Sequence, residues 1–291
     1  MLSLVFLSRK GGTGKSTLAY HMTATVVHAV EHRALGWRVL ALDFDEMGRF
    51  WQWICGNRLP SYRLDESLGA SWGVEVHRAV ERVEEALDAL WVGPRWLQQS
   101  FRKTPNEASK VVDGFLSVMR SYGVVVMDTA GVWDVVLMGL IGRFRELSDP
   151  CVYIIPFDCS PVSIDVVVAT VGVALDNLPR LGMVFIWPNL YGHGRSYREA
   201  VRMLGEVLQK KFRGWAYVGQ LDGRGGTPQA APNVMVASEE LWVPRSVRFV
   251  EAGAQRRTVQ DWGKLDVIER CRRALVLALT QLQRLQGGSH A

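Results

Sequence analysis

The chain has 291 residues, of which 48% are hydrophobic, which is enough for one large α/β domain with a well-filled core. Its formal net charge of +5 permits contact with an anionic polymer or lipid surface, but the same charge also serves simple solubility. The four cysteines stand far apart, without CxxC or Cys/His spacing, which disfavours a disulfide framework or a zinc site and predicts reduced thiols.

The apolar runs of the sequence bear on its location. Leu2 to Ser8 is apolar, but it lacks a basic leader and runs straight into a glycine loop, so we do not expect a signal peptide. No uncharged apolar stretch approaches the roughly 20 residues that a membrane-spanning helix needs. We therefore expect a soluble, cytoplasmic protein.

Apolar runs of strand length alternate with helical patterns, which is typical of a parallel sheet covered on both faces. We therefore expect an α/β fold with a doubly wound, mainly parallel sheet and helices on both faces. The expected strands are Ser3–Leu7, Arg38–Leu42, Val74–His77, Val124–Met127, Cys151–Ile155, Met183–Trp187 and Trp215–Val218. Ligands collect at the carboxyl ends of the strands in such sheets, so the residues that follow each run are candidates for chemistry.

The remaining segments predict a single domain over residues 1–285. Residues 78–110 are expected to form a helical insertion, with a charged helix from Glu81 to Leu90 and a polar loop after it. Residues 219–234 are rich in glycine and proline, so we expect a mobile loop there. Residues 286–291 are expected to form a disordered tail.

Arg9 to Thr17 read Arg-Lys-Gly-Gly-Thr-Gly-Lys-Ser-Thr, between the first strand and a helical pattern. Glycines let several N–H groups point at one anion, and the helix adds its positive N-terminal end. Lys15 supplies a charge for the β- and γ-phosphates, and Ser16 a hydroxyl for Mg²⁺. The expected phosphate-binding residues are Gly11, Gly12, Thr13, Gly14, Lys15, Ser16 and Thr17. The alternative is a glycine-rich turn with incidental lysines.

This loop resembles the deviant Walker A loop of the ParA/MinD superfamily of P-loop ATPases, in which a second, signature lysine lies early in the loop. Lys10 occupies that position. The general P-loop pattern asks for glycine where this chain has Arg9, but several residue types precede the signature lysine in the superfamily. The resemblance implies that Lys10 reaches across a dimer interface to the phosphates bound by the other subunit, so that ATP joins the two subunits.

Asp43-Phe44-Asp45, at the end of the second expected strand, is similar to the DxD segment of this superfamily. The resemblance implies that Asp45 orients or activates the attacking water and that Asp43 lies nearer the metal. The next residues, Glu46 to Gly48, keep only the glycine of the superfamily's usual Pro-Gln-Gly. The alternative for this turn is a helix capped by aspartate.

Asp128 follows the strand Val124–Met127 and is similar to the Walker B aspartate. The resemblance implies that Ser16, Asp43 and Asp128 hold Mg²⁺, partly through water, and that Asn189 and Pro244 border the adenine. A nitrogenase iron protein would need a cysteine shortly after Asp128 for its cluster, and none lies between Cys55 and Cys151, which disfavours that relative.

Basic residues gather in the second half of the chain. Relatives of the ParA type bind DNA without sequence preference through such residues, by contacts to phosphates. The candidates for DNA contact are Arg195, Arg198, Lys210, Lys211, Arg213, Arg270, Arg272 and Arg273. The alternative is a solvated helix face balanced by nearby glutamates. The last helical pattern, Leu265–Leu279, carries an apolar stripe that is expected to pack on the core rather than to anchor a membrane.

The resemblance as a whole implies a weak ATPase that uses ATP and Mg²⁺ and that is stimulated by an adaptor protein. With ATP it would form a homodimer, bind non-specific DNA on a nucleoid or plasmid, and serve partition or intracellular positioning. Two alternatives use the same switch. One is an accessory factor of conjugation or secretion that acts through protein contacts, and the other is a MinD-like ATPase positioned at a membrane surface.

Overall fold

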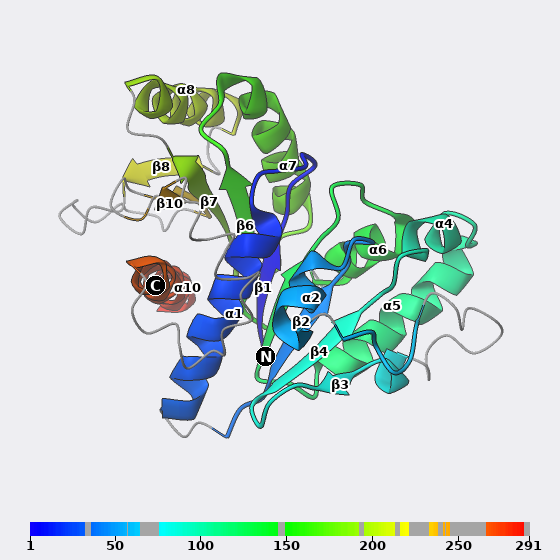
Figure 1. Ribbon diagram of the computed structural model, residues 1–291. Coiled ribbons are helices and arrows are strands. Elements are labelled where there is room, and N and C mark those ends of the chain that lie inside the picture. The colour runs from blue at the N-terminus through cyan, green and yellow to red at the C-terminus, as the bar shows by residue number, and fades with distance from the viewer. Residues whose placement is uncertain are drawn as a thin grey trace.

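The structure is a computed structural model in which a mainly parallel sheet runs through the centre of the chain (Figure 1). It describes residues 1–32, 36–56, 58–64, 76–144, 149–191, 195–212, 216–220, 233–237, 241, 243–244 and 266–287. Within these residues the sheet has ten strands, in the order β3-β4-β2-β5-β1-β6-β7-β9-β8, with β10 paired to β7. The expected doubly wound α/β fold is therefore confirmed.

The strands pair in parallel except β3 and β4, which are antiparallel. Their bounds are β1 Leu2–Phe6, β2 Val39–Asp43, β3 Glu81–Arg82, β4 Leu87–Trp91, β5 Val124–Asp128, β6 Cys151–Phe157, β7 Gly182–Tyr191, β8 Ala216–Gln220, β9 Val234–Val236 and β10 Val243–Pro244. Each expected strand except Val74–His77 overlaps one of these. Parallel pairing brings the carboxyl ends of the central strands to one edge of the sheet, which is where the site described below lies.

Helices cover both faces of the sheet, with α1 and α10 on one side and α5 and α6 on the other (Figure 1). Their bounds are α1 Lys15–His32, α2 Arg49–Cys55, α4 Trp96–Ser100, α5 Pro105–Met119, α6 Val135–Phe144, α7 Ile164–Asp176, α8 Arg195–Lys211 and α10 Asp266–Gly287, with a 3₁₀ turn, η1, at Pro161–Ser163. The start of α5 shows how the sequence sets such bounds. Thr104 and Glu107 form a capping box around Pro105, which lacks the N–H that a first helical residue would leave unpaired.

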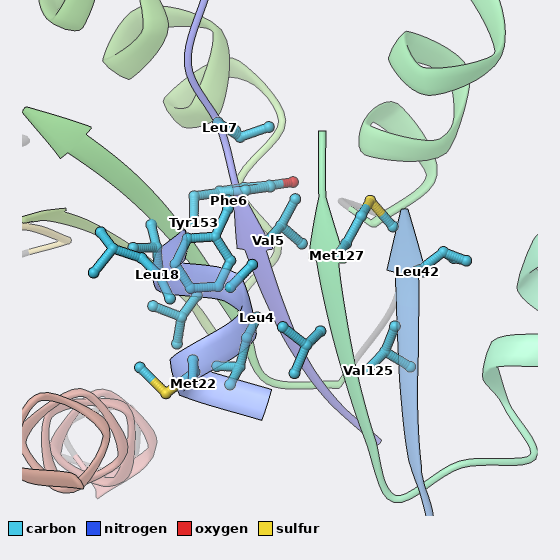
Figure 2. Packing of buried hydrophobic residues seen from close by; sticks show 14 of the residues in the cluster. Leu4, Val5, Phe6, Leu7, Leu18, Met22, Leu42, Val125, Met127 and Tyr153 are labelled. Carbon is cyan, nitrogen blue, oxygen red and sulfur yellow. The ribbon is translucent and has the colours of Figure 1, made fainter. Parts of the chain in front are cut away.

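The central strands are mostly apolar because both of their faces are covered. In β1, alternate side chains point to opposite faces, so Leu4 lies beside Met22 of α1 and Val5 lies beside Met127 of β5 (Figure 2). The four cysteines of the chain are buried free thiols. In α10, Cys271 and Ala278 are buried and the helix packs on α1, which confirms the core-packing face expected for this segment.

Two expected elements are wrong. Val76 to Arg78 form a helical turn, closed by a bond of 3.2 Å from the Ala79 amide to the Val76 carbonyl, so the described part of Val74–His77 is not a strand. The helix expected from Glu81 to Leu90 is instead β3 and β4, and β4 occupies the place beside β2. Residues 78–110 therefore do not form a purely helical insertion.

A buried carboxylate explains why β4 was not recognised. Asp88 interrupts the apolar pattern of a fully buried strand, and two of its three partners, Arg38 and Tyr122, come from distant parts of the chain. Arg82 Nε lies 2.8 Å from Asp88 Oδ1, the Tyr122 hydroxyl donates to Oδ2 at 2.6 Å, and Arg38 also pairs with this carboxylate. A buried charge is tolerated only with such partners, and the local pattern contains no sign of them.

Other predicted segments lie partly outside the described residues. Of the expected mobile loop 219–234, residues 219–220 end β8 and residue 234 begins β9, while residues 221–232 are not described. Of the expected tail, residues 286–287 end α10 and residues 288–291 are not described. Among the described residues, no helix is long and apolar enough to cross a membrane.

The aromatic cluster that joins α5 to the sheet gives a test of the packing. Phe115 is fully buried, with its ring centroid 5.0 Å from that of Phe44 and 5.9 Å from that of Trp96. We predict that Phe115→Ala lowers the free energy of unfolding by about 3–5 kcal/mol, measured by urea denaturation, because the cavity cannot close. The control Phe101→Ala removes a ring that is 58% exposed and should change it by less than about 0.5 kcal/mol. Equal effects would contradict this packing.

Candidate functional site

The loop between β1 and α1 is shaped by glycines in left-handed backbone conformations. Gly12 and Gly14 have φ of 75° and 84°, which residues with a side chain rarely adopt. Gly14 is also crowded, since a Cβ atom there would overlap the side-chain amide of Asn189. The loop leads into α1 at Lys15, so its backbone N–H groups and the helix N-terminus face the same space, as a phosphate requires.

The two lysines of this loop extend in different directions. Lys15 is mostly buried, and its Nζ lies 3.4 Å from the backbone carbonyl of Lys10, so it stays over its own loop. Lys10 Nζ instead donates to Asp158 Oδ2 and to Ser163 Oγ, both at 2.6 Å, beyond the end of β6. The loop therefore has one lysine that folds back over it and a second lysine that is held by the segment between β6 and α7.

The segment that holds Lys10 was not found from the sequence. Partial burial acts to raise the pKa of Asp158, but the hydrogen bonds from Lys10 and Ser163 outweigh it, so the pKa lies below its usual range. The next residue, Cys159, is buried and has φ of 53°, a left-handed conformation that is uncommon for a residue other than glycine. No motif marks these residues, and only the fold brings them to Lys10.

Two buried carboxyl groups end neighbouring strands beside the loop. Asp43 of β2 and Asp128 of β5 are register partners and are 1% and 0% exposed. Asp43 accepts the Asp45 amide at 2.9 Å on one oxygen and the Trp51 amide at 2.8 Å on the other. Asp43 thus anchors the turn into α2, as the capping alternative expected, while both oxygens keep lone pairs for a further ligand.

Asp128 differs from Asp43 in its hydrogen bonding, because neither of its oxygens has a well-formed hydrogen bond within the described structure. Burial raises the pKa of Asp128 to about 7, although Lys15 and the Ser16 hydroxyl act to lower it. Burial, and then repulsion by Asp128, also raises the pKa of Asp43 well above its usual value. Buried, adjacent carboxyl oxygens next to a serine hydroxyl are the donors that Mg²⁺ prefers, so the residues predicted to hold this ion fit it.

Asp45 lies just beyond the end of β2 and is partly exposed. Its Oδ1 accepts the Met47 amide at 3.1 Å, which forms a tight turn, and Gly48 closes this turn with φ of 57°. Glu46 turns away from the sheet end, and its Oε1 accepts the Leu97 amide of α4 at 3.0 Å. The residues that differ from Pro-Gln-Gly therefore form an ordered turn, and the carboxyl group of Asp45 lies near Asp128.

The two residues predicted to border the base lie near the loop. Asn189 is 3% exposed, and its Nδ2 donates to the carbonyl of Thr13 at 2.7 Å, so this amide supports the loop directly. Pro244 is in β10, which pairs with β7, where Val243 is opposite Asn189 and Pro244 is opposite Tyr191. This arrangement gives Asn189 a structural role in the loop, and its contact with adenine stays a prediction.

The residues predicted to contact DNA lie away from this site, on α8 and α10. Lys210 and Lys211 end α8 and are exposed. On α10, Glu269 binds Arg272 at 2.7 Å and Arg273 at 2.9 Å, and these bonds lower the pKa of Glu269 to about 2. The charges of these two arginines are therefore partly balanced. Arg213 lies outside the described residues.

Neither a protein-family model nor a curated protein sequence matches this chain. Solved structures match it over nearly its whole length. An ATP complex of a Cyanothece McdA variant matches with a TM-score of 0.66 and 15% identity and covers 96% of each chain. A putative plasmid partition protein from Borrelia burgdorferi bound to AMPPNP matches with a TM-score of 0.63 and 16% identity, covering 96% of this chain and 98% of that chain.

The MinD cell division protein of Aquifex aeolicus also matches, with a TM-score of 0.58, 16% identity and coverage of 99% of this chain and 97% of that chain. Identities this low show the fold alone. The chain therefore shares its fold, over nearly its whole length, with McdA, with MinD and with a ParA family ATPase from Chlorobium tepidum, which confirms the predicted resemblance at the level of structure.

Gly14 allows a test of the loop geometry. We predict that Gly14→Ala lowers nucleotide affinity at least about tenfold, because a side chain is strained in this backbone conformation and displaces Asn189. Titration with a fluorescent ATP analogue measures this. The control is Gly172→Ala on α7, where the new Cβ would lie 3.9 Å from the Phe212 ring, an ordinary contact. Wild-type affinity in Gly14→Ala would show that the loop does not bind the phosphates in this form.

Proposed function

We propose that this chain is a slow ATPase that binds ATP and Mg²⁺ at the loop between β1 and α1 and pairs with a second copy of itself when ATP is bound. The proposal rests on the different positions of the two lysine side chains. Lys15 remains over its own loop, whereas Lys10 Nζ lies at Asp158 and Ser163, outside that loop. A cation in that position is available to a triphosphate bound by another protomer.

Exposed apolar side chains around the same edge support pairing with a second copy. Met47 follows β2, Val132 follows β5, and Val162 follows β6, and they are 62%, 55% and 83% exposed. Single exposed apolar residues are common on protein surfaces, but these three follow the carboxyl ends of β2, β5 and β6, at the same edge of the sheet as the site. A partner that covers them would also exclude water from the triphosphate, which strengthens every charge interaction there.

The residues of the site have separate tasks in the proposed reaction. Lys15 and the loop N–H groups bind the β- and γ-phosphates, and Lys10 of each protomer neutralises charge on the phosphates of the other. Ser16, Asp43 and Asp128 would hold Mg²⁺, which supplies positive charge to the phosphate oxygens when it is bound. Asp45, partly exposed in its turn, orients the attacking water. Hydrolysis removes the γ-phosphate, and with it the charge that holds the pair together.

Non-specific DNA is the anionic surface that we propose for the ATP-bound pair, with α8 as the contacting element. Arg195, Lys210 and Lys211 are exposed on this helix, and pairing doubles the number of such charges. The α10 arginines are weaker candidates because Glu269 balances them. One observation favours a lipid surface instead, because Met203 and Val207 of α8 are 39% and 37% exposed among the basic residues.

We predict that substitution of the two lysines has different effects on ATP binding and on pairing. Lys15→Ala should abolish ATP binding, measured by isothermal titration calorimetry. Lys10→Ala should keep ATP affinity close to the wild-type value, because its side chain lies outside its own loop, yet it should sediment as a monomer with a non-hydrolysable ATP analogue. The matched control is Lys110→Ala, a lysine on α5. A Lys10→Ala variant that pairs as the wild type does would overturn the proposal.

A second prediction distinguishes DNA from lipid as the anionic surface that the protein binds. The double variant Lys210→Glu and Lys211→Glu should weaken ATP-dependent DNA binding and reduce the slope of log affinity against log salt by about 3 to 4, as expected when the two protomers of the pair lose four phosphate contacts. Arg272→Ala with Arg273→Ala is the matched control, and it should change the slope less because Glu269 already binds these arginines. Binding of the wild type to anionic liposomes but not to DNA would identify a lipid surface instead.

A further inference from the structure

The turn that carries Asp45 is held by the segment that follows β4. Trp91, the last residue of β4, donates its indole Nε1–H to the backbone carbonyl of Asp45 at 2.8 Å. Its ring also lies so close to Gly48 that a Cβ atom there would overlap it. Trp91 is 8% exposed, so water competes little for this hydrogen bond. The turn is thus fixed at its first and last residues by one side chain.

The same segment also holds the loop that follows Asp128. In α4, the Leu97 amide donates to Glu46 Oε1 at 3.0 Å, while the Trp96 indole donates to Asp134 Oδ2 at 2.9 Å. Asp134 ends that loop, and its other oxygen accepts the Val136 and Leu137 amides at 2.7 and 3.0 Å, which caps α6. Trp91 to Leu97, which we name the β4–α4 bridge, therefore contacts the loops of both Asp45 and Asp128.

The bridge is built to be rigid. Trp96 is fully buried, and its ring packs edge to face against Phe44, with centroids 6.0 Å apart. Phe44 is the residue between Asp43 and Asp45, so the packing reaches the strand end itself. Because both loops contact this one buried segment, a shift of one loop would be transmitted to the other through it.

We propose that Trp91 is a positioning residue for Asp45 and that the β4–α4 bridge joins the loop after β2 to the loop after β5. The inference rests on the proposed function, because it assigns Asp45 to the attacking water. The Asp45 carbonyl accepts the Trp91 indole and also the Gly48 amide at 2.9 Å, so loss of the indole bond leaves the turn closed but unties it from β4, and the whole turn with its carboxyl group can then shift. Misplacement by about 1 Å is enough to lower a rate by roughly a hundredfold.

Trp91→Phe tests this, because it keeps an aromatic ring and removes the N–H donor. The matched control is Trp187→Phe, since the Trp187 indole donates to the Leu241 carbonyl at the same distance of 2.8 Å, is also buried, and is in β7. We expect Trp91→Phe to lower kcat for ATP hydrolysis roughly ten- to a hundredfold with KM unchanged. Trp187→Phe should leave both values near those of the wild type. If Trp91 had a purely structural role, both variants would have a lower melting temperature, and neither would show a fall in kcat at unchanged KM.

Hydrogen–deuterium exchange provides a readout that does not need activity. Backbone amides of residues 44–51 should exchange faster in Trp91→Phe than in the wild type, and Trp187→Phe should leave them unchanged. Equal exchange and equal kcat in the two variants would overturn the inference. If the wild type hydrolyses no ATP, the proposed function fails, and the exchange of residues 44–51 still decides whether Trp91 holds this turn.

Discussion

The register of β2 with β5 brings Asp43 and Asp128 together at the ends of two buried strands, where both carboxyl groups are removed from water. Burial raises both pKa values, repulsion by Asp128 raises that of Asp43 further, and repulsion by Asp45 acts in the same direction on Asp128, so a second negative charge is unfavourable there without a nearby cation. Lys15 and Ser16 face Asp128 from the first turn of α1. The strand register therefore puts two buried carboxyl groups where a cation would stabilise them, beside the loop between β1 and α1, which we propose binds phosphates.

Side chains from neighbouring segments contact the loop between β1 and α1 in different ways. Asn189 supports the phosphate loop from β7, and Asp158 and Ser163 draw Lys10 away from it. Lys10 is thus paired within its own protomer, and release from Asp158 is part of what a triphosphate on a second protomer must supply. In the proposed function, ATP-dependent pairing follows from this arrangement, because each protomer holds Lys10 outside its own loop.

The sequence predicts which chemically reactive side chains lie at the strand ends, but it does not predict the contacts that position them. The structure places Gly14, Lys15, Asp43 and Asp128 at one edge of the sheet, as the glycine loop and the acidic strand ends predicted, and their binding of phosphate and metal stays a prediction. The strand β4 was missed because Asp88 breaks its apolar pattern and is satisfied by Arg38 and Tyr122, which are remote in sequence, and by Arg82 across the β3–β4 turn. Asp158 and Trp91 belong to no motif, and only the folded chain brings them to Lys10 and Asp45. Fold and phosphate loop were thus accessible from one sequence, whereas the contacts that position them were not.

Light scattering of the wild type without nucleotide, with ADP and with a non-hydrolysable ATP analogue tests the central claim most directly. The account predicts the mass of one 32.6 kDa chain in the first two conditions and twice that mass with the analogue. A single unchanged mass in all three conditions would contradict it.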